Sequence, residues 1–148
     1  MKIRIIIFLA AISFAYSCTT HFGTRKLADG WYNVADMENS IVENRPIVKA
    51  SGFMDLSLDS CYISGSTQMI YTINGKCRDV EKFSEATEKA IGKHIAFLFD
   101  GKMVCAPKVN ARIDRGNFMI TLPAGTSHLD ALMVLNALEK QMSGRQGE

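Results

Sequence analysis

The segment His94–Phe99, HIAFLF, constrains the fold more than any other part of this sequence. Both of its alternating sets of side chains are largely apolar, which predicts a central strand covered on both faces. Asp100-Gly101 follows, a dipeptide typical of two-residue hairpin turns, and KMVCAP is expected to return antiparallel as far as Pro107. The sequence therefore predicts a sheet built around this hairpin.

Other segments have the β-branched and aromatic residues that are typical of strands. They are GWYNVA, PIVKASGFMDLSLD, QMIYTIN, KVNARI and NFMITL. Asn74-Gly75 is a strong turn signal and predicts the end of QMIYTIN, and the last two segments are predicted to form a second hairpin about Asp114-Arg115-Gly116. Phe53, Leu56 and Leu58 do not alternate strictly, which predicts a bulge at Gly52 or Met54.

Two further segments have apolar residues at helical spacing. The first begins at Asp79, a capping residue, ends at Gly92, and has one apolar face formed by Val80, Phe83, Thr87, Ala90 and Ile91. The second follows Ser127, which with Asp130 makes a start similar to a capping box. Together the elements predict an α+β domain, with an antiparallel sheet of about five to six strands and two helices on one face.

The amino terminus is predicted to be a targeting segment. Lys2 and Arg4 precede the apolar run Ile5–Ala15, which is shorter than the roughly 20 residues of a membrane span and suits a signal-peptide core. The run ends in AYSC, which resembles the lipobox of bacterial lipoproteins. We therefore expect residues 1–17 to be removed and Cys18 to be lipidated, with ordinary signal cleavage nearby as the alternative.

The expected organisation is a tether at 18–29, one domain at 30–142 and a flexible tail at 143–148. The chain has 17 Lys and Arg against 15 Asp and Glu. Loss of residues 1–17 removes two cations and leaves fifteen charges of each sign, which lacks the basic footprint of a nucleic-acid-binding protein. The expected location is the bacterial cell envelope, attached to the membrane through lipid and facing the periplasm, and Thr19 after Cys18 favours the outer membrane.

No pattern indicates an enzyme, a metal site or a cofactor. The histidines have no ligand spacing, and the aspartates fall on separate turns or strand edges: His21, His94 and His128, and Asp55, Asp59, Asp100 and Asp114. If the chain turns about Gly65, Cys61 faces approximately residue 70, so separate thiols are expected for Cys61, Cys77 and Cys105. Cys105 lies mid-strand between Val104 and Ala106, where a small apolar packing role is usual.

One family pattern extends from Phe83 to Leu122. It consists of Phe83 and Thr87, Gly92, Ile95-Ala96, Asp100-Gly101-Lys102, Ala106-Pro107, Val109-Asn110 and Gly116. In this order and spacing the stretch resembles the head subdomain of the first periplasmic domain of SecD and SecDF, membrane accessories of the bacterial Sec translocase. GWYNVAD and PIVKASGF look like segments of small envelope lipoproteins that carry this head as their only domain.

The resemblance implies a ferredoxin-like α+β module that contacts polypeptide in the periplasm, with a link to protein export. Proton-driven energy coupling does not carry over, because that activity belongs to transmembrane helices of the family that this sequence does not show. Cys105 stands where the family commonly has Ser, which favours a structural role.

The predicted partner-binding residues lie at the tip of the second hairpin: Asn110, Arg112, Asp114 and Arg115. Cations beside unpaired strand edges suit strand addition by a polypeptide, and a tip that is merely solvated is the alternative. Two other hypotheses stay open. One is a structural or ligand-binding lipoprotein with a small-molecule or glycan pocket around Trp31, Tyr32 and Tyr71, and the other is a thiol enzyme using Cys105.

Overall fold

The computed structural model describes residues 26–144 as seven strands, two α-helices and one 3₁₀ turn. The predicted signal peptide, Cys18, most of the tether and the end of the tail lie outside the described residues. In chain order the elements are β1 (Gly30–Asp36), β2 (Ile41–Lys49), the 3₁₀ turn η1 (Ala50–Gly52), β3 (Phe53–Tyr62), β4 (Met69–Cys77), α1 (Val80–Lys89), β5 (Ile95–Phe99), β6 (Lys102–Cys105), β7 (Asn117–Thr121) and α2 (His128–Ser143).

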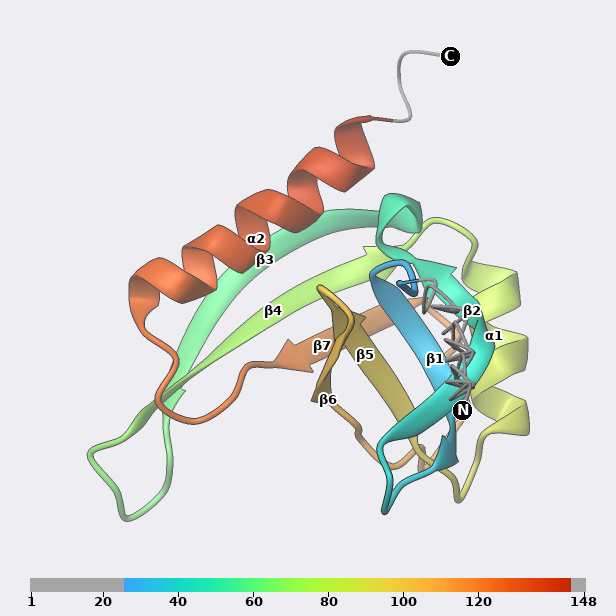
Figure 1. Ribbon diagram of the computed structural model, residues 1–148, viewed down its shortest axis with the longest axis horizontal. Helices are drawn as coiled ribbons and strands as arrows, with labels where there is room; N and C mark the ends of the chain where they lie inside the picture. Colours follow the sequence, from blue (N-terminus) through green and yellow to red (C-terminus); the bar gives the residue numbers. More distant parts are fainter. Residues whose placement is uncertain (1–25, 145–148) are drawn as a thin grey trace, which may run out of the picture.

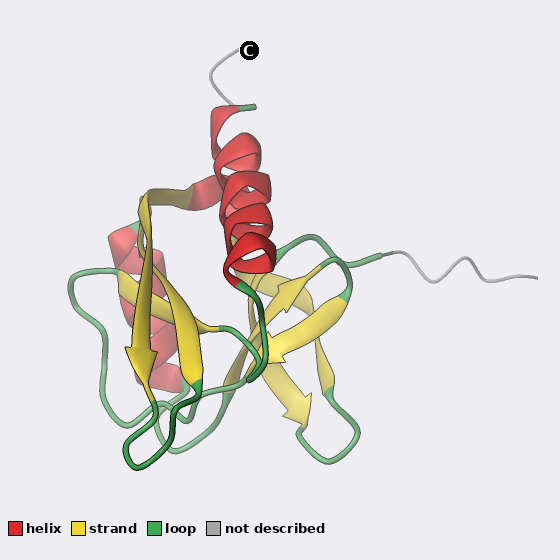
Figure 2. Cartoon of the chain, turned by 90° about the vertical axis from the view of Figure 1, so that its left-hand side faces the viewer, coloured by secondary structure: helices red, strands yellow, loops and turns green. Residues whose placement is uncertain are grey.

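The strands form two antiparallel sheets, with orders β2-β1-β5-β6 and β3-β4-β7. In Figure 2 they fall into two groups. The predicted α+β class, with antiparallel strands and two helices, is confirmed, but the prediction of a single sheet is wrong. The reason lies at η1, where buried Ala50 donates its amide to Asp29 O at 2.8 Å and the chain leaves one sheet for the other.

The helices do not share one face of a sheet. Helix α2 lies along β3 and η1, whereas α1 contacts β2 at the opposite side of the fold (Figure 1). Both predicted caps are confirmed: Asp79 Oδ1 accepts from Lys82 N at 3.0 Å, and Ser127 Oγ accepts from Asp130 N at 3.1 Å. Each cap satisfies an amide that the first helical turn leaves without a backbone partner.

The main core lies between the two sheets. Trp31 and Phe97 come from the first sheet, and Phe53 and Phe118 come from the second. Their rings meet with centroids 6.0 Å apart for Trp31–Phe118 and 6.2 Å apart for Phe53–Phe97. On the other face of the first sheet, Tyr32, Ala96 and Leu98 form a second buried cluster. Strand β5 is therefore buried on both faces, as its sequence predicts.

The predicted turn at Asn74-Gly75 is wrong, because β4 continues through both residues to Cys77. Gly75 lies opposite Phe118 of β7. A Cβ atom at Gly75 would lie 2.5 Å from Leu56 Cδ2 and 2.6 Å from Phe118 Cζ. Glycine here makes room for an aromatic ring rather than a turn.

The true connection from β3 to β4 is the loop around Gly65, whose φ is 79°. Cys61 pairs with Ile70, as expected for a turn at this glycine. The predicted bulge is present, but its register shift falls between Met54 and Ser57, where Asp55 has a φ of 54°.

The second predicted hairpin does not form. Strand β7 pairs with β4, and the preceding segment makes only an isolated bridge between Lys108 and His94. The cause is burial, since Phe118 and Ile120 pack into the core only when β7 joins the second sheet. Residues 106–116 are left as an irregular loop.

We predict that Gly75→Ala lowers the free energy of unfolding by about 1–3 kcal/mol, because the methyl group would overpack the contact with Leu56 and Phe118. Urea unfolding followed by the fluorescence of Trp31, the single tryptophan and fully buried, measures the change. Gly144→Ala is the control, because a Cβ there meets nothing closer than 3.6 Å. Equal stabilities of the two variants would contradict the packing role of Gly75.

Candidate functional site

The residues predicted to bind a partner lie on the irregular loop 106–116, which folds against α1 rather than projecting as a hairpin tip. All four residues are exposed, although the Arg112 side chain keeps only 36% of its accessible surface. They differ in their contacts, because Arg112 and Asp114 form hydrogen bonds with side chains of α1.

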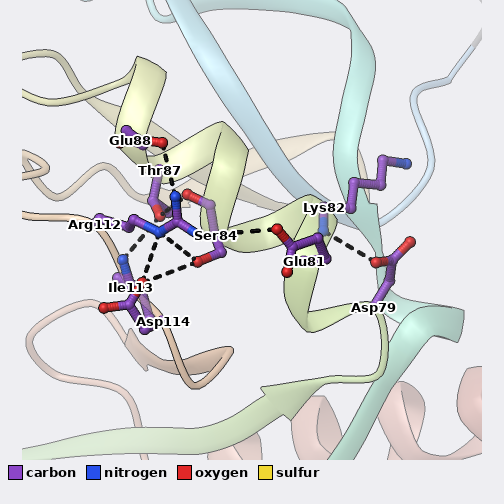
Figure 3. Close-up of polar contacts among 9 residues, drawn as sticks. All are labelled: Asp79, Glu81, Lys82, Ser84, Thr87, Glu88, Arg112, Ile113 and Asp114. Carbon is purple, nitrogen blue, oxygen red and sulfur yellow. Dashed lines mark hydrogen bonds and ion pairs between the residues drawn. The ribbon is translucent and has the colours of Figure 1, made fainter.

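Arg112 connects the loop to α1 (Figure 3). Its Nε donates to Asp114 Oδ1 at 2.6 Å and to Ser84 Oγ at 3.0 Å, and its Nη1 donates to Glu88 Oε2 at 2.9 Å. Glu81 Oε1 lies 3.9 Å from Nη2. The hydrogen bond to Asp114, followed by the negative charge of Glu88, raises the pKa of Arg112. Three carboxylates therefore surround the guanidinium of Arg112, and its charge is balanced within the fold.

Thr87 of α1 holds the same loop against the helix. Its side chain is fully buried, its Oγ1 accepts from Ile113 N at 3.0 Å, and its hydroxyl donates to Ser84 O at 3.0 Å. Sequence reasoning assigned Thr87 to the apolar face of the helix and missed this role. A lone threonine in the middle of an apolar helical face was the available signal.

A second candidate site lies at the far end of the β3–β4 hairpin, here called the distal arm and defined as residues 59–71. Figure 1 shows the arm extending past β7, with the start of α2 beside it. A groove of about 330 Å³ is lined by Leu58, Asp59, Ser60, Met69, Tyr71 and His128. The Tyr71 and His128 rings lie 5.5 Å apart.

The elements that border the groove also carry exposed apolar side chains. Tyr62, which pairs with the lining residue Met69, is 65% exposed, and Leu129, next to His128 in the chain, is 67% exposed. Large exposed apolar side chains are candidates for contact with other molecules. The sequence did not predict this site, because the arm and the first turn of α2 are separated by more than fifty residues and meet only in the tertiary structure.

The aromatic pocket considered as an alternative is not present in its expected form. Trp31 and Tyr32 are each 1% exposed, and the Tyr32 hydroxyl donates to Ala28 O at 2.7 Å. Tyr71 alone of the three lies at a groove. Trp31 and Tyr32 belong to the buried clusters on the two faces of the first sheet instead.

The three described cysteines are free thiols. Cys61 is exposed on the arm, whereas burial raises the pKa of the Cys77 thiol to about 12. Burial also raises the pKa of Cys105. That shift is opposite to the one that activates a nucleophilic thiol, so it argues against Cys105 as a catalytic residue.

Among residues 26–144, no three His, Cys, Asp or Glu side chains gather where they could hold a metal ion. No helix in this part of the chain is long and apolar enough to cross a membrane.

The chain is similar to known proteins in its family pattern, in its sequence and in its fold. A family model described as the SecDF P1 head subdomain matches residues 29–138. Protein translocase subunit SecD of Acidaminococcus fermentans is 31% identical over 81 residues, which are 55% of this chain and 19% of that protein. The chain therefore spans about a fifth of the length of this relative.

Two solved structures share the fold. One is described as a membrane component SecDF that enhances protein export, with a TM-score of 0.52, 21% identity, and coverage of 66% of this chain and 41% of that one. The other is SecDF in a super-membrane-facing form, with a TM-score of 0.50, 19% identity, and coverage of 72% and 14%. At these identities the two structures establish likeness of fold alone.

We predict that Thr87→Val lowers the free energy of unfolding by about 1–2 kcal/mol, because the Ile113 amide loses its acceptor while the volume stays nearly unchanged. Hydrogen exchange of the Ile113 amide should accelerate in the same variant. Thr121→Val on β7 is the control, since its side chain is only half-buried and valine suits a strand. An unchanged exchange rate at Ile113 would show that Thr87 does not hold the loop.

Proposed function

Because this chain belongs to the SecDF P1 head subdomain family, we propose that it is a non-enzymatic, lipid-anchored protein of the bacterial cell envelope whose domain contacts other polypeptides during protein export. The family match over residues 29–138 carries the proposal. A SecDF structure with the same fold is described as enhancing protein export, which supports the link to that process.

The proposed anchor is the lipidated Cys18, which follows the apolar run Ile5–Ala15. Residues 18–29 would then tether the domain to the membrane, with the periplasm as its location and the outer membrane favoured by Thr19. The anchor would hold the domain close to polypeptides that leave the translocase, so that contact becomes a local encounter rather than a search through the compartment.

Two surfaces are candidates for the contact. On loop 106–116, Asn110 and Arg115 are free to bind, while Arg112 and Asp114 keep the loop in shape. At the distal arm, the groove offers apolar and aromatic contacts through Tyr71, with Tyr62 and Leu129 exposed nearby. An extended polypeptide that has not yet folded exposes apolar side chains, so the arm suits such a partner better than the charged loop does.

A ligand-binding or purely structural lipoprotein is the alternative function. The adjacent rings of Tyr71 and His128 in the groove are the feature that favours a small ligand or glycan. Burial of Trp31 and Tyr32 in the core removes the other aromatic residues on which that hypothesis depended.

The polypeptide contact is tested by photo-crosslinking in intact cells. A photoreactive amino acid at position 62 is expected to capture exported polypeptides through the arm, and one at position 115 tests the loop. Position 39 is the control, because Asn39 is exposed on the turn between β1 and β2. Capture at neither 62 nor 115, or the same products from all three positions, would refute a specific polypeptide contact.

The anchor is tested by metabolic labelling with a clickable fatty acid. The full chain should incorporate the label and Cys18→Ser should not, because the thiol of residue 18 is the proposed acyl acceptor. Cys61→Ser is the matched control, since it removes a different thiol, which is exposed, and should leave labelling unchanged. Label retained in Cys18→Ser would place the modification elsewhere.

A further inference from the structure

A basic hollow lies at the opposite end of α2 from the distal arm. It has a volume of about 760 Å³ and is enclosed by the end of β2, η1, the start of α1 and the end of α2. Its lining residues are Pro46, Val48, Lys49, Ser51, Gly52, Arg78, Asp79, Lys82, Gln141 and Gly144. Neither the family resemblance nor the polypeptide contact assigns a role to this hollow.

Three exposed cations line the hollow, and Asp79 is the one carboxylate among the lining residues. The carboxylate of Asp29 is bound to the lining residue Gln141. Lys49, Arg78 and Lys82 form no ion pair with any residue of the described part of the chain, in contrast to Lys26, which pairs with Asp100, and to Arg112. Asp79 is engaged as the cap of α1, where it accepts from Lys82 N. The lining therefore carries a net charge of about plus two, which would be relieved by a bound anion.

The form of the hollow indicates what kind of anion fits. The first turn of α1 opens beside it and adds the positive end of the helix dipole, and Figure 3 shows the Lys82 side chain directed away from the Arg112 cluster. Pro46 and Val48 supply an apolar wall next to the cations. A phosphate group that carries an apolar moiety matches both parts of this lining.

The hollow lies beside the segment that leads to the proposed lipid anchor at Cys18. Asp29 accepts from Gln141 Nε2 at 2.7 Å and from the Ala50 amide at 2.8 Å, so the segment that leads back to Cys18 enters the domain beside the hollow. The twelve residues 18–29 span at most about 40 Å when fully extended. A lipid on Cys18 would hold the hollow within that distance of the bilayer surface.

We propose that this hollow binds the phosphate of an anionic phospholipid headgroup and thereby orients the domain on its membrane. Lys49, Arg78 and Lys82 would contact the phosphate, and Pro46 and Val48 would contact the glycerol backbone. The proposal rests on the lipid anchor of the proposed function, which supplies the proximity to the bilayer, but it involves no polypeptide partner.

Vesicle co-sedimentation tests the proposal on the full chain carrying Cys18→Ser, so that no attached lipid contributes to binding. Phosphatidylcholine vesicles with and without phosphatidylglycerol are compared for three proteins. These are the chain itself, the hollow variant Lys49→Gln/Arg78→Gln/Lys82→Gln, and the control variant Lys89→Gln/Lys93→Gln/Lys108→Gln. The control removes three exposed, unpaired cations at and beyond the other end of α1, and Trp31 fluorescence verifies that all three proteins are folded.

The phosphatidylglycerol-dependent part of the affinity should fall about tenfold or more in the hollow variant and by less than about twofold in the control. Equal losses of affinity in both variants would show that only general surface charge matters and would overturn the proposal. An unchanged affinity in the hollow variant would overturn it as well. Inorganic phosphate is titrated in parallel by NMR. Saturation by phosphate without any phosphatidylglycerol dependence would make the ligand a free phosphate and also overturn it.

The result of the vesicle experiment does not depend on the results of photo-crosslinking and fatty-acid labelling. Vesicle binding by the Cys18→Ser chain requires neither an exported polypeptide nor the acyl group, so it can succeed where photo-crosslinking or fatty-acid labelling fails. Conversely, labelling of Cys18 together with unchanged vesicle binding in the hollow variant would retain the anchor and remove the headgroup site.

Discussion

The aromatic contact between the two sheets is the interaction on which the rest of the structure depends. Trp31 and Phe97 from the β1–β5 pair meet Phe53 and Phe118 from the second sheet, with centroids 6.0 Å apart for Trp31–Phe118 and 6.2 Å apart for Phe53–Phe97. Phe118 reaches this position only because Gly75 leaves space beside it. Because Phe118 is buried beside Gly75, β7 pairs with β4 in the second sheet. This pairing determines the path of the chain before and after β7.

The loop before β7 takes its shape from that pairing. With β7 bound to β4, residues 106–116 have no partner strand and fold onto α1, where Thr87 accepts from the Ile113 amide and Arg112 joins Ser84, Glu88 and Asp114. A segment whose sequence suggests a basic hairpin tip thus becomes a loop held against α1, with the charge of Arg112 balanced by carboxylates. Under the proposed function, the groove at the distal arm would then be the better candidate surface for an unfolded polypeptide.

Helix α2 places the two proposed contact sites at its opposite ends. His128 lines the groove at the distal arm, whereas Gln141 and Gly144 line the basic hollow. The sixteen residues of the helix correspond to about 24 Å between these ends. If the hollow faces the bilayer, the groove is held away from the membrane surface, where a polypeptide in transit is accessible. The anchor, the hollow and the groove would then act in one orientation.

Local signals in the sequence determined the elements that depend on neighbouring residues: the caps at Asp79 and Ser127, the hairpin turn at Asp100-Gly101 and the burial of β5 on both faces. The family pattern from Phe83 to Leu122 likewise depends on the order and spacing of its residues, and the family match over residues 29–138 confirms it. Only the tertiary structure decided how strands far apart in the chain pair. The division into two sheets, the role of Gly75 and the buried polar role of Thr87 follow from that pairing. Asn74-Gly75 shows the physical reason: the dipeptide has the preference for a turn, but burying Phe118 against Gly75 stabilises the extended strand more than a turn would.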